Sequence, residues 1–312
     1  MYAQTASYRS AYFGRSATEE SQISSIRRVS VLSTGTVQIR PPHVQSNGTP
    51  LLWWLLTSRT WTAPLPINVY VVEHDAGLVL FDAGQDRASV TDSAYFPGGM
   101  LGFLYGRLGR FDIPPEHTLA AGLAALGYAT SDVRKVVISH LHQDHIGGLP
   151  ELRNADIYVS NDEWQTLASP LALLDGLMKD HIDLPGLNWT RVQFNGSRLG
   201  PFEASYDLMG DGSMILLPTP GHTRGSMSLL MQRLHGDPLL LVGDLTYSCE
   251  LFHKGAITGV GDPKQLHRTS ALVLELESQV PNLRILAAHD PGAARSLSES
   301  GNVSEALPGG AS

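Results

Sequence analysis

The chain has 312 residues, of which 42% are hydrophobic and 17% charged, a composition of globular rather than disordered proteins. Its formal net charge is −8, with no run of lysine or arginine longer than Arg27-Arg28, which argues against a nucleic-acid-binding groove. The single cysteine, Cys249, excludes an intrachain disulfide framework and a thiolate zinc cluster, so a metal site would have to use histidine and carboxylate.

The two ends of the chain differ in composition from its middle. Residues 1–24 are rich in serine, threonine, alanine and tyrosine and contain no apolar run of the kind found in secretory signals. No stretch approaches the ~20 apolar residues of a membrane span, so no membrane partner is expected and the cytoplasm is the expected location. We predict a flexible N-terminal arm over residues 1–24, a single domain over 25–292 and a flexible C-terminal tail over 293–312.

Runs of apolar residues, many of them β-branched, predict strands in two groups, and helices follow each group. The predicted strands, in chain order, are residues 25–39 (one or two strands), 67–72, 78–81, 136–138, 157–160, 214–217, 226–231, 239–242 and 283–287. Helices are predicted over residues 114–127, after a cap at Asn161 or Asp162, over 171–178 and from 263 onward. Two groups of strands, each followed by helices, predict two sheets packed face to face with helices outside.

Two apolar segments lie outside this pattern. Residues 51–56 contain the adjacent pair Trp53 and Trp54, which cannot both face inward on a strand, so one should face a pocket or a subunit partner. Residues 91–110 are rich in glycine and aromatic side chains, and we expect an irregular loop that covers the substrate or forms a dimer contact. A homodimer is therefore an expected assembly.

Residues 139–148 contain four metal-ligand side chains directly after the predicted strand that ends at Ile138. Alternate residues of an extended chain point to the same face, so His140 and His142 can bind one ion together. Asp144 and His145 follow the end of the strand, where the chain can turn them toward a second ion. Imidazole nitrogen and carboxylate oxygen are ligands for zinc and similar metals.

Three more predicted strands end in residues of the same kind. His222 follows the strand at 214–217 in a tight turn, Asp244 ends the run at 239–242, and His289 follows the last strand. One strand that ends in histidine or aspartate is common. The same pattern four times is what a site at one edge of a sandwich requires.

The HxHxDH spacing of residues 140–145, with these later residues, resembles the metallo-β-lactamase superfamily. The resemblance implies a four-layer αβ/βα sandwich of two mixed sheets with two divalent ions per chain, zinc first among candidates that include iron, manganese and cobalt. It implies the following ligands: His140, His142 and His222 for one ion, Asp144, His145 and His289 for the other, with Asp244 bridging them. It also implies a nucleophilic hydroxide between the ions, and an aspartate, Asp82, that orients a histidine ligand.

Two residues indicate a branch within the superfamily. Asp244 is absent from true β-lactamases of this fold, which argues against β-lactams as the main substrate. Tyr247, three residues later, resembles the tyrosine of the N-acyl homoserine lactonases, and the segments 64–70, 80–85 and 288–291 resemble that branch too. The resemblance covers about residues 29–291.

These matches predict a lactonase that opens the ring of N-acyl homoserine lactones, an activity known as quorum quenching. Tyr247 would stabilise the oxyanion and Asp144 would transfer a proton, while residues 53–61 and 100–105 would contact the acyl chain. Gln143 departs from the aromatic residue of the well-known lactonases. The alternatives are an arylesterase or organophosphate hydrolase at the same site, and a non-catalytic protein that keeps the fold as a scaffold.

Overall fold

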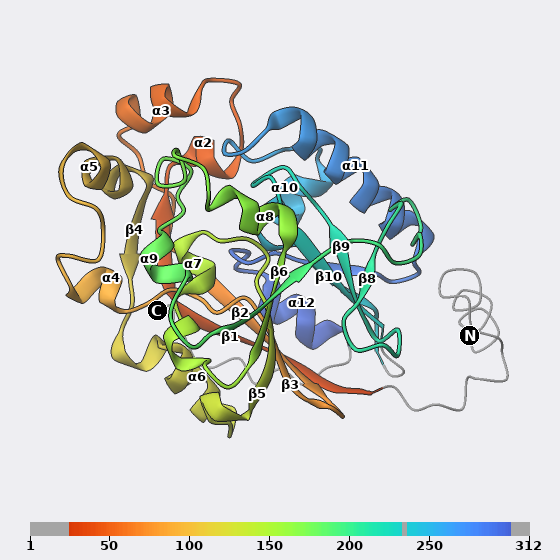
Figure 1. Ribbon diagram of the computed structural model, residues 1–312. Helices are drawn as coiled ribbons and strands as arrows, with labels where there is room; N and C mark the ends of the chain where they lie inside the picture. The colour runs from red at the N-terminus through yellow and green to blue at the C-terminus, as the bar shows by residue number, and fades with distance from the viewer. Residues whose placement is uncertain (1–24, 233–235, 301–312) are drawn as a thin grey trace, which may run out of the picture.

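Two mixed β-sheets pack face to face in the computed structural model, which describes residues 25–232 and 236–300 (Figure 1). The first sheet has the strand order β4-β1-β2-β3-β5-β6-β7 and the second the order β12-β11-β10-β9-β8. The first sheet contains β1 (Ile26–Ile39), β2 (Leu65–His74), β3 (Gly77–Phe81), β4 (Gly109–Asp112), β5 (Val133–Val137), β6 (Asp156–Ser160) and β7 (Asn188–Val192). The second contains β8 (Tyr206–Asp207), β9 (Met214–Pro218), β10 (Met227–Met231), β11 (Leu239–Leu241) and β12 (Arg284–Leu286).

Three clusters of buried apolar residues separate four layers. The cluster between the sheets contains side chains from both, such as Phe81 and Leu229. On the outer face of the first sheet a second cluster includes Leu123 of α6 (Leu119–Ala125). A third joins the second sheet to α11 (Pro263–Gln279), with Leu240 and Val273 among its members. The predicted αβ/βα sandwich is therefore confirmed.

The other helices are short and lie mainly in the connections between strands. They are α2 (Pro41–Val44), α3 (Leu51–Thr57), α4 (Ala88–Thr91), α5 (Gly99–Leu108), α7 (Gln143–Ile146), α8 (Asn161–Thr166), α9 (Lys179–Ile182), α10 (Cys249–His253) and α12 (Ala293–Glu299). Single 3₁₀ turns are η2 (Pro115–His117), η3 (Thr130–Asp132), η4 (Leu149–Glu151) and η5 (Gly243–Leu245). Among the described residues, no helix has the length and apolar character to cross a membrane.

The segment at 51–56 is helical, and the expected loop at 91–110 is irregular only over 92–98, because residues 99–108 form α5 and β4 begins at Gly109. In α3, successive side chains point about 100° apart, so Trp54 is buried while Trp53 is 65% exposed. In α5, three glycines obscure the helical pattern in the sequence. Its Tyr105 packs with Tyr95 and Met178, and this cluster holds the helix in place.

Two local predictions in the middle of the chain are wrong. Ser160, and not Asn161 or Asp162, caps α8, because its side chain accepts a hydrogen bond from the backbone of Glu163. Residues 171–178 form consecutive turns instead of a helix, and Gly176 there has a φ of 84°, which ends helical geometry.

The predicted flexible tail from residue 293 is also wrong over its first part. Residues Ala293–Glu299 form α12, and Ala293 and Leu297, four residues apart, are buried against the cluster between the sheets. The sequence is polar there, but two apolar residues at this spacing are enough to dock a short helix. The remainder of the tail, 301–312, and the predicted arm, 1–24, lie outside the described residues.

Candidate metal centre

The strand ends that carry the predicted ligands meet at one edge of the sandwich. Three groups of side chains among the described residues could each share a metal ion. They are His140, His142 and His222; His140, His145 and Asp244; and Asp144, His145 and His289. All seven predicted ligands therefore lie together, although they come from four separate segments of the chain.

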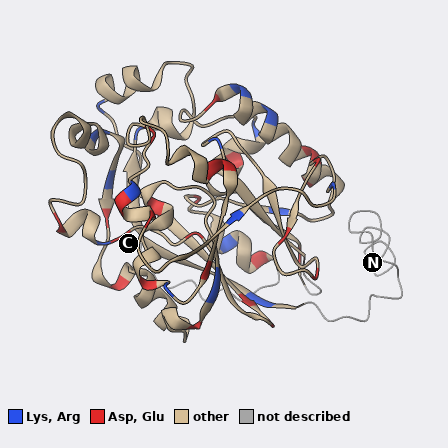
Figure 2. Ribbon diagram, in the orientation of Figure 1, with Lys and Arg blue, Asp and Glu red and all other residues tan. Residues whose placement is uncertain are grey.

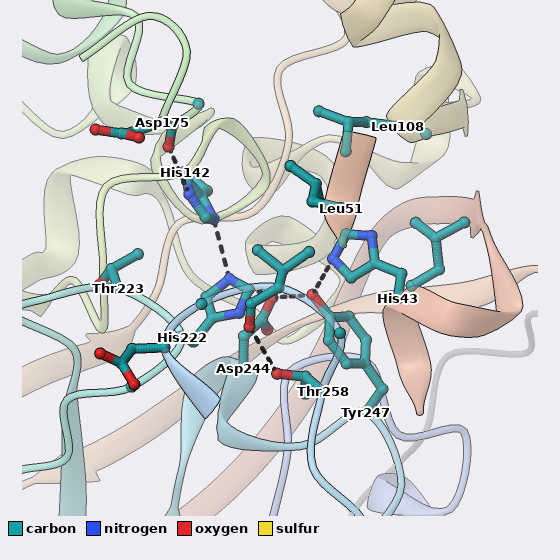
Figure 3. A pocket seen from close by; sticks show the side chains of 18 of the residues that line it. His43, Leu51, Leu108, His142, Asp175, His222, Thr223, Asp244, Tyr247 and Thr258 are labelled. Atoms are coloured by element: carbon teal, nitrogen blue, oxygen red, sulfur yellow. Dashed lines mark hydrogen bonds and ion pairs between the residues drawn. The ribbon is translucent and has the colours of Figure 1, made fainter. Parts of the chain in front are cut away.

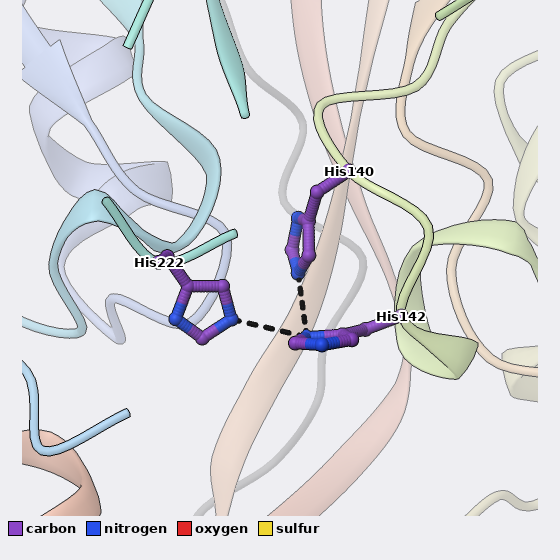
Figure 4. Close-up of side chains that lie close together, drawn as sticks. All are labelled: His140, His142 and His222. Carbon is purple, nitrogen blue, oxygen red and sulfur yellow. Dashed lines mark hydrogen bonds between the residues drawn. The ribbon is translucent and has the colours of Figure 1, made fainter. Parts of the chain in front are cut away.

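The first group consists of three imidazole rings that face one another (Figure 4). The Nδ1 atom of His142 lies 3.0 Å from Nε2 of His140 and 3.1 Å from Nε2 of His222. His140 and His222 are buried, and His142 is half-buried and lines the cavity described below. These three nitrogens can bind a single ion.

The second group lies next to the first, and Asp244 lies between them. The Oδ1 atom of Asp244 is 3.4 Å from Nε2 of both His145 and His289, while its Oδ2 atom is 3.6 Å from Nε2 of His222. Asp144 completes the second group, with its carboxylate oxygens 3.7 Å from His145 and 3.5 Å from His289. Each oxygen of Asp244 therefore faces a different group, as a bridging ligand requires.

Hydrogen bonds on the far side of the rings turn the free nitrogens inward. The Nδ1 atom of His289 lies 2.8 Å from the carbonyl oxygen of Pro66, and Nε2 of His142 lies 3.0 Å from that of Asp175. A carbonyl can only accept, so each of these nitrogens carries the proton. The opposite nitrogen is left with its lone pair toward the site, which is the form that binds a metal.

Atoms without partners show that this cluster fits a cation. Nε2 of His145, Nε2 of His289 and Oδ1 of Asp244 are all buried and have no hydrogen-bond partner among the described residues. Nδ1 of each ring donates to an oxygen atom, so each Nε2 atom can offer its lone pair to an ion beside the Asp244 oxygen. Such a convergence in a buried site is unfavourable unless a positive ion lies among the acceptors.

The charge states also suit metal binding. Burial holds the pKa values of His140 and His222 well below the usual range, so both rings are neutral. Burial alone would raise the pKa of the Asp244 carboxyl, but His289 and His145 hold it well below its usual value. His140 and His222 therefore offer neutral imidazoles beside the Asp244 carboxylate. Burial alone would lower the pKa of His145, but the carboxylates of Asp244 and Asp82 raise it well above its usual range.

Asp82 forms the predicted hydrogen bond to a histidine of the cluster, His145. Its Oδ2 atom accepts from Nδ1 of His145 at 2.9 Å and from the hydroxyl of Ser139 at 3.0 Å, and its Oδ1 atom accepts from the Ser139 backbone at 2.7 Å. Asp82 has a φ of 64°, an uncommon conformation for a residue other than glycine. The hydrogen bonds keep it in this conformation.

Tyr247 has its hydroxyl at the site. The hydroxyl donates a hydrogen bond to Oδ2 of Asp244 at 2.7 Å (Figure 3). The ring stacks on His289 with centroids 5.2 Å apart. The ring also packs against Val37 and Ile67, so the residue serves the core as well. Nε2 of His43 lies 3.0 Å from the same hydroxyl, and the sequence did not single out this histidine.

Glu163 is a second residue that the sequence did not reveal. Its fully buried carboxylate accepts from the backbone of Leu141 at 3.0 Å, from the hydroxyl of Thr223 at 2.7 Å and from the backbone of Gly225 at 3.0 Å. Leu141 lies between two of the predicted ligand histidines and Thr223 follows a third. In the sequence, Glu163 three residues after Ser160 matches a helix capping box, which conceals this role.

A cavity of about 830 Å³ opens onto the cluster. The side chains of His142, Asp144, His222, Asp244 and Tyr247 line its polar end. Its apolar lining comprises Val37, Ile39, Leu51, Tyr105, Leu108, Phe111, Leu174, Leu177 and Val260.

The expected acyl-chain contacts at 53–61 and 100–105 are therefore wrong except at Tyr105. Trp53 and Met100 project outward, because they lie on the solvent faces of their helices. Trp61 is held between the guanidinium groups of Arg40 and Arg110, whose central carbons lie 3.5 and 4.3 Å from the ring centroid. The neighbouring residues Leu51 and Leu108 line the cavity instead.

Comparisons with known proteins agree with this geometry. Residues 62–308 match the family described as the Metallo-beta-lactamase superfamily. The chain is 28% identical over 230 residues to the N-acyl homoserine lactonase AttM of Agrobacterium fabrum, covering 73% of this chain and 83% of the relative. It is 30% identical over 188 residues to an N-acyl homoserine lactonase of a Bacillus species, covering 60% of this chain and 67% of that protein.

A solved structure shares the fold. It is an N-acyl homoserine lactone hydrolase with the product N-hexanoyl-L-homoserine bound at the catalytic metal centre. The TM-score is 0.70 at 23% sequence identity, and the match covers 87% of this chain and 96% of the other.

Replacing Glu163 by glutamine tests its role in joining the two ligand loops. The amide NH₂ would face N–H or O–H donors, so we expect a loss of about 1–3 kcal/mol in unfolding free energy. Metal affinity should fall by about 10- to 100-fold, because the loops before and after the histidines would shift. Denaturant titration and competition with a chelator measure the two effects. The exposed Glu203→Gln is the charge control, and equal metal affinity in both variants would contradict the role.

Proposed function

Because the chain belongs to the Metallo-beta-lactamase superfamily, we propose that it is a dinuclear metal hydrolase that opens the lactone ring of N-acyl homoserine lactones. The observation that carries this proposal is the hydroxyl of Tyr247, 2.7 Å from the carboxylate of Asp244 and at the polar end of the cavity. A hydrogen-bond donor beside the ligand cluster suits a reaction that develops negative charge on a carbonyl oxygen. The relatives named as lactonases, at 28% and 30% identity, support the same substrate class.

The metal ligands that we propose follow the two groups. They are His140, His142 and His222 for one ion, Asp144, His145 and His289 for the other, and Asp244 for both. This set of nitrogen and oxygen ligands accepts zinc, iron, manganese or cobalt, and we propose zinc first. When bound, two divalent ions supply an activated water and polarise the scissile carbonyl.

The protein's own residues bind and orient the substrate around this centre. The apolar part of the cavity, which includes Leu51, Leu108 and Phe111, excludes water from the acyl chain. Tyr247 donates a hydrogen bond from its hydroxyl to the carbonyl oxygen as charge develops there. Asp144, whose side chain is 17% exposed compared with 2% for Asp244, can receive a proton and return it to the alkoxide that leaves.

A substrate panel on protein of known metal content tests the function. We expect two ions per chain by elemental analysis, and a kcat/KM for N-acyl homoserine lactones well above that for aryl esters and phosphotriesters. Removal of the metal with a chelator should reduce turnover to background, and added zinc should restore it. Faster turnover of a phosphotriester than of any lactone would contradict the lactonase proposal and favour an organophosphate hydrolase.

Tyr247→Phe tests the hydroxyl directly. It removes a donor to the developing oxyanion, so we expect kcat for the lactone to fall by about 100-fold while the metal content stays the same. Tyr158→Phe is the matched control, because Tyr158 is also buried and its hydroxyl also forms a side-chain hydrogen bond, to Lys135. Full kcat in Tyr247→Phe would remove tyrosine from the mechanism.

We also propose that the chain forms a homodimer through an apolar rim around the mouth of the cavity. The rim comprises Leu51, Leu52, Trp53 and Leu56 on α3, Met100 and Phe103 on α5, and Leu171, Leu173 and Leu174, all exposed. The side chain of Arg107 on α5 bonds to backbone carbonyls at the end of α3, so the two helices form one surface. Figure 2 shows α3 without charged residues, which reduces repulsion between two copies of an acidic chain.

Light scattering during gel filtration tests the dimer. We expect twice the mass of one chain for the wild type and the mass of one chain for Trp53→Glu. The glutamate would place a charge without a partner in the dimer interface. Val90→Glu adds a charge at another exposed apolar residue, outside the rim, and should stay dimeric. A monomeric wild type would contradict the proposal.

A further inference from the structure

His43 is a half-buried histidine whose ring faces the hydroxyl of Tyr247 (Figure 3). Its Nε2 atom lies 3.0 Å from that oxygen, and the two rings meet edge to face with centroids 5.2 Å apart. His43 also lines the cavity, close to the polar end. We infer that His43 is a positioning residue that donates a hydrogen bond to the Tyr247 oxygen and holds it where the substrate carbonyl binds.

The direction of the hydrogen bond follows from the donors available. A phenol hydroxyl has one proton, and Tyr247 donates it to Oδ2 of Asp244 at 2.7 Å. A carboxylate has no proton to return, so the contact between Tyr247 and His43 needs a proton from the imidazole. Nε2 of His43 is therefore the protonated nitrogen. Its Nδ1 atom has no hydrogen-bond partner among the described residues, which agrees with a bare lone pair on that side.

The neutral state of His43 agrees with this assignment. Burial lowers the pKa of His43 to about 4, so the ring carries one proton at neutral pH. With that proton on Nε2, the ring donates its single hydrogen bond to the hydroxyl oxygen of Tyr247.

The backbone around His43 is held on both sides. Its N–H donates to the carbonyl of Arg40 at 2.8 Å, and its own carbonyl accepts from the N–H of Gly259 at 2.9 Å. A Cβ atom on Gly259 would lie 1.9 Å from the carbonyl oxygen of Pro42, so glycine is needed for this close approach. The ring of Trp54 lies 5.8 Å from that of His43 and limits its rotation. The histidine is therefore a fixed donor.

The consequence for the reaction concerns the Tyr247 proton. As the hydroxyl turns its proton from Asp244 to the substrate carbonyl oxygen, the hydrogen bond from His43 to the phenol oxygen remains. That bond stabilises the negative charge that the phenol oxygen gains, which makes the hydroxyl a stronger donor. No proton leaves His43 in this step. The inference rests on the proposed role of Tyr247 and extends it to a residue outside the ligand set.

A double-mutant cycle with His43→Phe and Tyr247→Phe tests this inference. His43→Phe keeps an aromatic ring but removes the donor, so we expect kcat to fall about tenfold with KM within about twofold. In the Tyr247→Phe background the same change should have no further effect, because the acceptor is absent. His43→Gln restores an N–H near the position of Nε2 and should recover most of kcat. Metal content should remain two ions per chain in every variant.

His74→Phe is the control for loss of a buried histidine, because His74 is hydrogen-bonded to Ser213 at the far end of β2. Equal losses from His43→Phe with and without Tyr247 would overturn the inference, and so would unchanged kcat in His43→Phe. Loss of metal from His43→Phe would also overturn it, since the histidine would then support the ligands. The cycle is run on the substrate that the wild type hydrolyses fastest. If that substrate is an ester and not a lactone, the result contradicts the proposed function, but the cycle still tests the role of His43.

Discussion

The buried carboxylate of Asp82 is the interaction on which the rest of the site depends. It ends β3 in a left-handed conformation and accepts three hydrogen bonds from Ser139 and His145, just past the end of the neighbouring strand β5. The Ser139 hydroxyl in turn lies 3.0 Å from Nδ1 of His140. One carboxylate therefore orients a histidine in each ligand group, and the strain of its backbone, about 1 kcal/mol, is offset by these bonds.

The residues of the candidate metal centre come from both sheets. The loop after β5 offers four of the proposed ligands, but the other three, His222, Asp244 and His289, follow strands of the other sheet. The apolar cluster between the sheets fixes the distance between them. Glu163 joins the two sheets through hydrogen bonds to Leu141, in the loop after β5, and to Gly225, in the loop after β9. Buried carboxylates usually destabilise a protein unless they are fully paired. In this protein the carboxylates of Asp82 and Glu163 accept hydrogen bonds from several donors. The Oδ1 atom of Asp244 has no hydrogen-bond partner among the described residues, so it is available to an ion.

The sequence predicted the layers from local patterns, and all seven residues that the family resemblance implies as ligands lie together in the structure. Apolar runs define the strands, and metal-binding residues just beyond them must meet at the edge where the strands end. His43 and Glu163 escaped notice because their roles depend on contacts between distant segments. His43 follows two prolines in a stretch with no strand pattern. The helix α12 was missed for a related reason, since a polar segment reveals its two buried residues only when a surface exists to receive them.

The position of His289 after β12 has a consequence for the order of events during synthesis. The first four ligands are made well before His222, and the last appears only when nearly the whole domain has been translated. A nascent chain that stops before β12 leaves β11 without a neighbouring strand on that side and lacks His289 of the second group. On the proposed ligand set, the second group gains its last ligand only after β12 has been translated, so a complete centre forms on a nearly finished domain.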